Sequence, residues 1–297
     1  MKLGRKDYTI SVKTGTDANK AKFKKECVQG EIYHATDTGF FYIAEVTAGA
    51  SDATLSKFGT PAFVNLKSVS FDGTDDSLDV ASTSDYAFGT SGFSIGFWFN
   101  PVGTNNSSGF GVNIFDMRSV TVNQAKPSLW MSSTGSGSIL KYYADGAYRT
   151  TWSGTLNPGS WYHLLITNDG SNTKFYLNGN STAIATGSDS TNYIAAGLRL
   201  GGYSGNAYYY NGLIDEFAIW NATLSGADST AIYNSGVCND LSEASSYDTD
   251  RTSNLIGWWR MGDGTEAGSG TTVYDMSSNS NNGTLTNGPT FSTSVPS

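Results

Sequence analysis

Tyrosine-rich segments are the residues of this sequence best suited to binding chemistry. The segment GGYSGNAYYYNG (201–212) sets four tyrosines among glycines and asparagines, and a second cluster contains Tyr142, Tyr143, Tyr148 and Trp152. Aromatic rings can stack on the apolar faces of sugars, and rigid, amphipathic tyrosines are common recognition residues. The pattern predicts a glycan-binding surface, with packing at a subunit interface or ordinary strand placement as the alternative. The predicted ligand-binding residues are Tyr203, Tyr208, Tyr209, Tyr210 and Trp152.

Oxygen-bearing side chains in expected turns are candidate ligands for Ca²⁺, which takes carboxylate, amide and carbonyl oxygens. Asp215 alternates with the apolar Leu213 and Phe217, so an unpaired charge there is costly and needs a cation or backbone donors. Turn capping, which Asp and Asn often perform, is the alternative. No Cys or His spacing indicates zinc. The candidate calcium ligands are Asp72, Asp215, Asp275, Asn279 and Asn281.

Side chains for catalysis are sparse. The chain has two histidines, and His163 lies inside an apolar run, which is typical of a core residue. There is no Gly-x-Ser-x-Gly nucleophile elbow and no glycine-rich phosphate loop. Glucanase carboxylates alternate along a strand so that they face one cleft, and Ile214-Asp215-Glu216 lacks that alternation. We expect a protein that is not an enzyme, with a polysaccharide depolymerase as the weakest alternative.

The composition narrows the class of protein. Of 297 residues, only 15% are charged, whereas 35 are glycine and 13% are aromatic, which favours an all-β fold with many tight turns. The net charge of −8 argues against a nucleic-acid partner. The two cysteines, Cys27 and Cys238, are expected to be free thiols. The first residues contain no apolar signal-peptide core, and no apolar run is long enough for a membrane span.

Strand-like segments recur between residues 68 and 220, and they must position these side chains. In FSIGFWFNP, Phe93, Ile95, Phe97 and Phe99 share one face, while Ser94, Gly96, Trp98 and Asn100 share the other. That period of two predicts a strand with one buried face. Residues 161–166 are apolar on both faces, as in a central strand. A short helix is expected after the capping box of Ser225 and Asp228, ending near Gly236.

The order of these segments resembles the laminin-G-like branch of the concanavalin-A-like jelly rolls, which includes pentraxin-like domains. The resemblance implies a two-sheet antiparallel jelly-roll sandwich. Domains of this family often carry a structural calcium ion. The matching segments are Phe71-Asp72-Gly73, Phe93 to Pro101, Gly159 to Gly170, Phe175 to Gly179 and Gly212 to Trp220.

The C-terminal segment 254–291 resembles a block that commonly precedes the FDG segment in this family. Here it follows the body of the domain. Because the ends of a jelly roll are usually close together, a circular permutation is physically reasonable. We expect IGWWRM to supply a strand to the same sandwich. A separate tail, or a strand donated to a neighbouring subunit, is the alternative.

Residues 30–46, GEIYHATDTGFFYIAEV, predict a hairpin with Asp-Thr-Gly at its turn. The segment resembles an element near the start of many phage fibre and head-fibre proteins, although Ala44-Glu45 departs from the usual Gly-Asp-Gly. The resemblance implies a small, intertwined attachment domain that is usually trimeric. The basic run NKAKFKKE (19–26) is either a solvated face or a docking surface for an acidic assembly.

The sequence therefore predicts a small N-terminal β attachment domain at residues 1–67 and a laminin-G-like jelly roll at residues 68–297, with 254–291 as a permuted strand block. We expect a virion structural protein, a homotrimer bound to other capsid or tail proteins, that adheres to host or environmental polysaccharide. The alternative is a capsid decoration or cement protein with a purely structural role.

Overall fold

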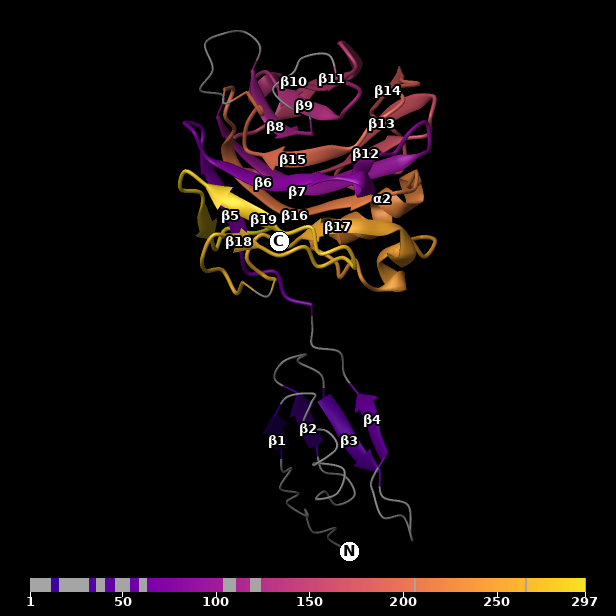
Figure 1. Ribbon diagram of the computed structural model, residues 1–297, viewed down its shortest axis with the longest axis vertical. Helices are drawn as coiled ribbons and strands as arrows, with labels where there is room; N and C mark the ends of the chain where they lie inside the picture. Colours follow the sequence, from indigo (N-terminus) through magenta and orange to yellow (C-terminus); the bar gives the residue numbers. More distant parts are fainter. Residues whose placement is uncertain are drawn as a thin grey trace, which may run out of the picture. The chain divides into compact units, whose positions relative to one another are not determined.

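The computed structural model contains two compact units, Met1–Val64 and Asn65–Ser297 (Figure 1). It describes residues 63–103, 111–117, 124–205, 207–264 and 266–296, the side chain of Ser136 excepted, and the backbone of four strands within residues 1–62. The predicted boundary at 67/68 falls slightly later than the division. Asn65 donates to Asp215 at 2.9 Å, and the backbone N–H groups of Leu66 and Lys67 donate to Asp263 at 2.6 and 2.9 Å. These bonds tie residues 65–67 to the second unit.

The first unit contains a four-stranded sheet in the order β1-β2-β3-β4. β2 and β3 pair antiparallel, with Ile32 opposite Ile43, as the hairpin at 30–46 requires. The hairpin turn, Cys27 and the basic run 19–26 lie outside the described residues, as does the side chain of His34. The strands are β1 Val12–Gly15, β2 Ile32–Ala35, β3 Phe41–Glu45 and β4 Thr54–Phe58.

The second unit is a sandwich of two antiparallel sheets, which confirms the predicted jelly-roll class. Sheet I has the strand order β11-β10-β9-β8-β15-β6-β19-β18. Its strands are β6 Ser77–Thr83, β8 Val112–Asp116, β9 Ser128–Met131, β10 Gly135–Ala144, β11 Ala147–Leu156, β15 Ala196–Leu200, β18 Thr272–Val273 and β19 Gly283–Thr286.

Sheet II has the order β14-β13-β12-β7-β16-β5-β20, and β17 also pairs with β16. Its strands are β5 Ser68–Asp72, β7 Phe93–Gly103, β12 Tyr162–Asn168, β13 Asn172–Leu177, β14 Ala185–Ser188, β16 Asn211–Trp220, β17 Leu255–Trp259 and β20 Thr290–Ser292. Short 3₁₀ turns are η2 Ser84–Tyr86, η3 Asn234–Gly236, η4 Ala244–Ser246 and η5 Thr252–Asn254.

The core lies between the two sheets. Phe93, Ile95, Phe97 and Phe99 of β7 point into it, as their spacing predicts. The prediction of a single buried face for β7 is wrong, because the helix and the chain after it cover the opposite face. Trp98, for example, is buried and stacks on Tyr233 with ring centroids 5.3 Å apart.

The covering helix is α2, Gly226–Tyr233. Its predicted capping box is present, since the Asp228 N–H donates to Ser225 Oγ at 3.0 Å and the Ser225 N–H donates to Asp228 Oδ2 at 2.8 Å. The helix ends before Gly236, because Asn234 adopts a left-handed conformation with φ 46°. No described helix is both long and apolar enough to cross a membrane.

The C-terminal block completes this chain's own sandwich. β17 pairs with β16, β19 pairs with β6, and β20 pairs with β5. In Figure 1 the yellow strand β19 lies beside β6, from the start of the domain. Trp259 is fully buried in the core, and Trp258 is also buried. Ser68 Oγ donates to the Ser294 carbonyl at 2.7 Å, so both ends of the jelly roll meet at one edge.

Candidate functional site

The register of sheet I separates its two faces. One cross-strand row lies wholly in the core and consists of Tyr142, Leu129, Phe115, Leu200, Leu78 and Leu285. Because side chains alternate along each strand, the adjacent row lies on the outer face. This outer row consists of Tyr148, Tyr143, Ser128, Asp116, Arg199, Asp79, Thr284 and Thr272.

An aromatic cluster lies on this outer face at β9. Trp130 follows the core residue Leu129, and its ring centroid is 5.2 Å from that of Tyr208 and 6.1 Å from that of Tyr203. The loop that carries both tyrosines is attached to β8, because the Asn113 N–H donates to the Tyr208 carbonyl at 2.8 Å. The structure thus brings together two of the predicted tyrosines and adds a tryptophan.

The other predicted aromatic residues lie elsewhere. Tyr210 is fully buried in the core, and its hydroxyl donates to the Leu213 carbonyl, so its predicted role in stacking on a sugar is wrong. Trp152 is half-buried, pairs across from the core residue Leu140 and packs against the core from the edge strand β11, away from the aromatic cluster. Tyr209 is half-buried, with its ring packed beside Gly202.

A second aromatic pair lies in the outer row at the edge of sheet I. Tyr143 and Tyr148 meet edge-to-face with ring centroids 5.4 Å apart. The ammonium of Lys141 lies 5.3 Å from the centre of the Tyr148 ring, and Tyr148 is 47% exposed. Tyr142, which precedes Tyr143 in the sequence, points into the core and donates to the hydroxyl of Tyr193 at 3.0 Å.

An open polar pocket lies next to the aromatic cluster. It offers about 130 Å³ of space to water-sized molecules and is lined by Asp79, Asp116, Arg199 and Ser204, among others. Arg199 Nε donates to Asp79 at 2.6 Å, and Ser204 donates through its N–H and its hydroxyl to Asp116 at 3.0 and 2.7 Å. The pocket therefore presents carboxylate acceptors and a guanidinium donor beside aromatic rings.

The predicted calcium ligands fall into three separate settings. Asp72 lies with Asp75 and Asp76, and one carboxylate oxygen from each lies within 4.8 Å of the others. Asp76 is buried, and burial together with the neighbouring Asp72 and Asp75 carboxylates raises its pKa. Three converging carboxylates are a donor set that suits Ca²⁺. No other cluster of three such ligands occurs among the described residues.

Asp215 is buried in β16 beside the buried Glu216, which has a left-handed φ of 46° at a β-bulge. Asp215 accepts from the Asn65 amide at 2.9 Å and from the Glu216 N–H at 2.8 Å. Glu216 accepts from the indole of Trp258 at 2.6 Å and from Arg260 at 3.1 Å. Hydrogen-bond donors of the protein thus offset the burial of both carboxyl groups.

The C-terminal candidates cap a turn. Asp275 accepts from the N–H groups of Trp258, Ser277 and Asn281 at 2.8 to 2.9 Å. The Asn279 amide donates to the Ile256 carbonyl at 3.1 Å. The Asn281 amide donates to Asp85 at 2.9 Å. These bonds match the turn-capping alternative.

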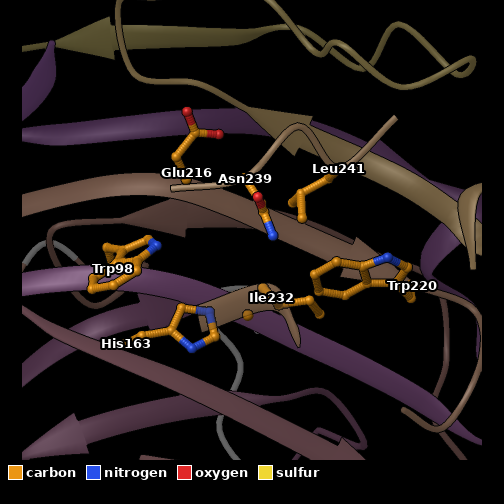
Figure 2. Close-up of a pocket in the computed structure, with 8 residues that line it drawn as sticks. Trp98, His163, Glu216, Trp220, Ile232, Asn239 and Leu241 are labelled. Carbon is orange, nitrogen blue, oxygen red and sulfur yellow. The ribbon is translucent and has the colours of Figure 1, made fainter. Parts of the chain in front are cut away.

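A small pocket lies on the outer side of sheet II, under α2 and the segment that follows it (Figure 2). His163 faces Trp98 there, with ring centroids 5.1 Å apart, and Glu216 lies above them. Burial lowers the pKa of His163 to about 3, so its imidazole is neutral. The pocket has a volume of about 10 Å³, which is room for roughly one water molecule. His163 is thus buried, as expected, but under α2 and not in the core between the sheets.

Several residues of the site were missed from the sequence, namely Trp130, Asp79, Asp116 and Arg199. Trp130 stands in LWM, where both neighbours are apolar, so no alternation marks it as an outward residue. The charged residues come from three strands distant in sequence, and only the register brings them together. Asp75 and Asp76, by contrast, follow Asp72 directly in DGTDD, a local signal that could have been used.

Fold and outer face together define a jelly roll of the lectin type. The Laminin G 3 family profile, described as the concanavalin A-like lectin/glucanases superfamily, matches residues 72–228. The chain belongs to this family. No curated protein matches the chain.

Solved structures share the fold at low identity. A Bacteroides ovatus protein to which carbohydrate binding is ascribed is 15% identical, with a TM-score of 0.52, over 91% of this chain and 72% of its own. A heptameric pentraxin from Limulus polyphemus is 15% identical, with a TM-score of 0.44, over 58% and 84%. Domain 4 of a Geobacillus stearothermophilus arabinanase, solved with arabinotriose, is 20% identical, with a TM-score of 0.36, over 48% and 68%.

Proposed function

We propose that the jelly roll binds carbohydrate on the outer face of sheet I, at the aromatic cluster of Trp130, Tyr203 and Tyr208 and the adjoining polar pocket. The observation that carries the proposal is the juxtaposition of the half-buried Tyr203 and Tyr208 rings, which pack against the buried Trp130, with the polar pocket of Asp79, Asp116 and Arg199. Family membership and the fold shared with a protein to which carbohydrate binding is ascribed add support.

The two halves of the site suit the two sides of a sugar. Its C–H faces are apolar and pack on aromatic rings, whereas its hydroxyl groups both donate and accept hydrogen bonds. Carboxylates accept from hydroxyls, and the guanidinium of Arg199 donates in a fixed planar geometry. Bonds to charged groups are stronger than bonds between neutral groups. A sugar ring resting on Tyr203 with its hydroxyls in the pocket satisfies both requirements.

The Tyr203→Ala variant should lose retention in gels that contain the polysaccharide bound by the wild type. Loss of a ring contact of roughly 1.5 kcal/mol corresponds to about a tenfold weaker affinity. Tyr203→Phe keeps the ring and should retain most of the affinity. Val237→Ser, at an exposed position that follows α2, serves as the control. Unchanged retention of Tyr203→Ala would assign this ring a structural role.

Binding without cleavage is part of the proposal. Asp215 and Glu216, the carboxylates of the IDE segment, are buried and engaged by protein donors. Release of new reducing ends from a bound polysaccharide would contradict this part.

We also propose a structural calcium ion at Asp72, Asp75 and Asp76. Its charge would offset the repulsion among these three carboxylates and so stabilise the turn between β5 and β6. Ca²⁺ should raise the melting temperature of the wild type, and Asp75→Asn should reduce that rise. Asp145→Asn, at an exposed carboxylate, is the control. Equal responses of both variants to Ca²⁺ would show that the ion does not bind at this turn.

We further propose that the protein is displayed on a virion as a trimer through residues 1–64. The support is the resemblance of residues 30–46 to phage attachment elements and the β2–β3 hairpin formed there. Light scattering should give three times the chain mass for the full chain and the monomer mass for residues 65–297. Antibodies against the jelly roll should label assembled particles. A monomeric full chain, or detection only as a free cellular protein, would contradict the proposal.

A further inference from the structure

Recognition features are spread along the outer row and are not confined to one point. Tyr148 and Tyr143 lie on β11 and β10 at the sheet edge, while Arg199 and Asp79 lie on β15 and β6. From β11 to β15 there are four intervals between neighbouring strands. Strands are about 4.8 Å apart, so this part of the row is about 19 Å long. That length exceeds a single sugar several times.

The loop that carries the aromatic cluster lies between these two ends. Ser204 bonds to Asp116 on β8, and the Tyr208 ring meets Trp130 on β9. Ser128 and Asp116 of the outer row are buried, whereas Tyr203 and Tyr208 are half-buried. Aromatic side chains are thus presented at β11, at β10 and over β9, and the polar pocket follows at β8, β15 and β6.

The spacing of neighbouring strands suits a polysaccharide chain that crosses them. One sugar unit of an extended polysaccharide has nearly the length of one strand interval. A chain that runs perpendicular to the strands therefore passes from Tyr148 and Tyr143 over the aromatic cluster to the polar pocket, with about one sugar for each strand interval. A terminal sugar would use only the cluster and the pocket, and would leave Tyr143 and Tyr148 without a role.

The charges in this part of the face balance. Asp79 and Asp116 are offset by Arg199, which bonds to Asp79, and by Lys141, which lies against the Tyr148 ring. The two carboxylates would repel a polyanion, and the two basic groups would repel a polycation. An uncharged chain is repelled by neither set of charges.

We infer that the ligand is an extended, uncharged polysaccharide, bound through internal sugar units across β11, β10, β9, β8 and β15. The inference rests on the proposed glycan-binding function, since it names the ligand class of the same site. It predicts a dependence on chain length, and it assigns to Tyr148 a contact that short ligands do not reach.

The test begins with the intact protein and a panel of soluble polysaccharides. Hydroxyethylcellulose, xyloglucan, galactomannan, pullulan and arabinan represent uncharged chains, and alginate and hyaluronan represent polyanions. The polysaccharide that retains the protein most strongly in affinity gels is cut into fragments from a monosaccharide to an octasaccharide. Calorimetry then measures the affinity for each fragment with the wild type, Tyr148→Ala and Tyr148→Phe.

We expect an uncharged polysaccharide to be selected and the affinity to rise from the disaccharide to about the pentasaccharide before it levels off, since the row spans about four strand intervals. Tyr148→Ala should weaken hexasaccharide binding about two- to tenfold and leave disaccharide binding unchanged. Tyr148→Phe should behave as the wild type.

Three results would overturn the inference. A monosaccharide or disaccharide bound as tightly as the hexasaccharide would indicate a terminal-sugar site and would leave the proposed function intact. Preferential retention by alginate or hyaluronan would reject an uncharged ligand. If no polysaccharide retains the protein, both the proposed function and this inference are wrong.

Discussion

A chain that ends at residue 253 should not fold into a stable jelly roll. The deletion removes β17, β18, β19 and β20, and it takes Trp259, Met261, Val273 and Leu285 out of the core. Each large core side chain contributes on the order of 2–5 kcal/mol, and a whole domain is stable by only about 5–15 kcal/mol. Circular dichroism and thermal melting should show no cooperative transition for the shortened chain.

A circular permutant provides the matched control. Residues 250–296 are placed before residues 65–249, and a short Gly-Ser linker joins Pro296 to Asn65. Because Ser68 and Ser294 are hydrogen-bonded at 2.7 Å, this linker spans a small gap. The new ends lie in an exposed stretch around Asp250. The permutant should fold and melt cooperatively. A permutant that fails to fold, or a deletion that folds, would contradict the role given to the C-terminal block.

The contribution of the buried pair Asp215 and Glu216 to the stability of the jelly roll should fall between about pH 4.5 and pH 7. Burial raises the pKa of Glu216 from 4.5 to about 7, and burial together with the neighbouring Glu216 raises the pKa of Asp215. A group whose folded pKa is raised stabilises the fold below its unfolded pKa, and that contribution is lost as the pH rises through the folded pKa. For Glu216 the loss is on the order of 3 kcal/mol.

The measurement compares the wild type with Glu216→Gln across this pH range. The wild type should lose roughly 5 to 10 °C of melting temperature relative to the variant, since 1 kcal/mol is worth about 2–4 °C in a domain of this size. Buried His163, whose pKa is lowered to about 3, destabilises the fold toward acid. The effect of His163 is the same in both proteins, so it cancels when their melting temperatures are compared. Parallel pH profiles would contradict the prediction, and Asp145→Asn should match the wild type.

The strands of the jelly roll could be predicted because their local patterns agree with their tertiary environment. Phe93, Ile95, Phe97 and Phe99 show the period of a strand and face the core. The same pattern misjudged the other side of β7. Trp98 looks like one residue of an open face, and only the position of α2 explains its burial. Local periodicity reports a strand's own alternation and not what lies above it.

The candidate site depends on register, which the sequence does not display. Tyr203 and Tyr208 could be predicted from the Gly-rich loop, but their partner Trp130 is presented by β9. Tyr210 has the same local composition around it and yet lies in the core. The chain reverses at Tyr208, whose φ is 58°, and the Tyr210 N–H then pairs with the Gly201 carbonyl. Composition identifies the loop, but the backbone path decides which ring faces outward.

The meeting of β5 and β20 at one edge also sets how the domain responds to mechanical load. Ser68 lies opposite Ser292 in an antiparallel pair, so the chain enters and leaves the sandwich at the same end of that pair. Tension between the two ends therefore opens the β5–β20 hydrogen bonds one after another, like a zipper. Tension between the entry at β5 and a ligand held on sheet I does not pull on β20, so it does not open that pair from its end. The direction of pull thus decides whether the C-terminal strand is peeled away or stays closed.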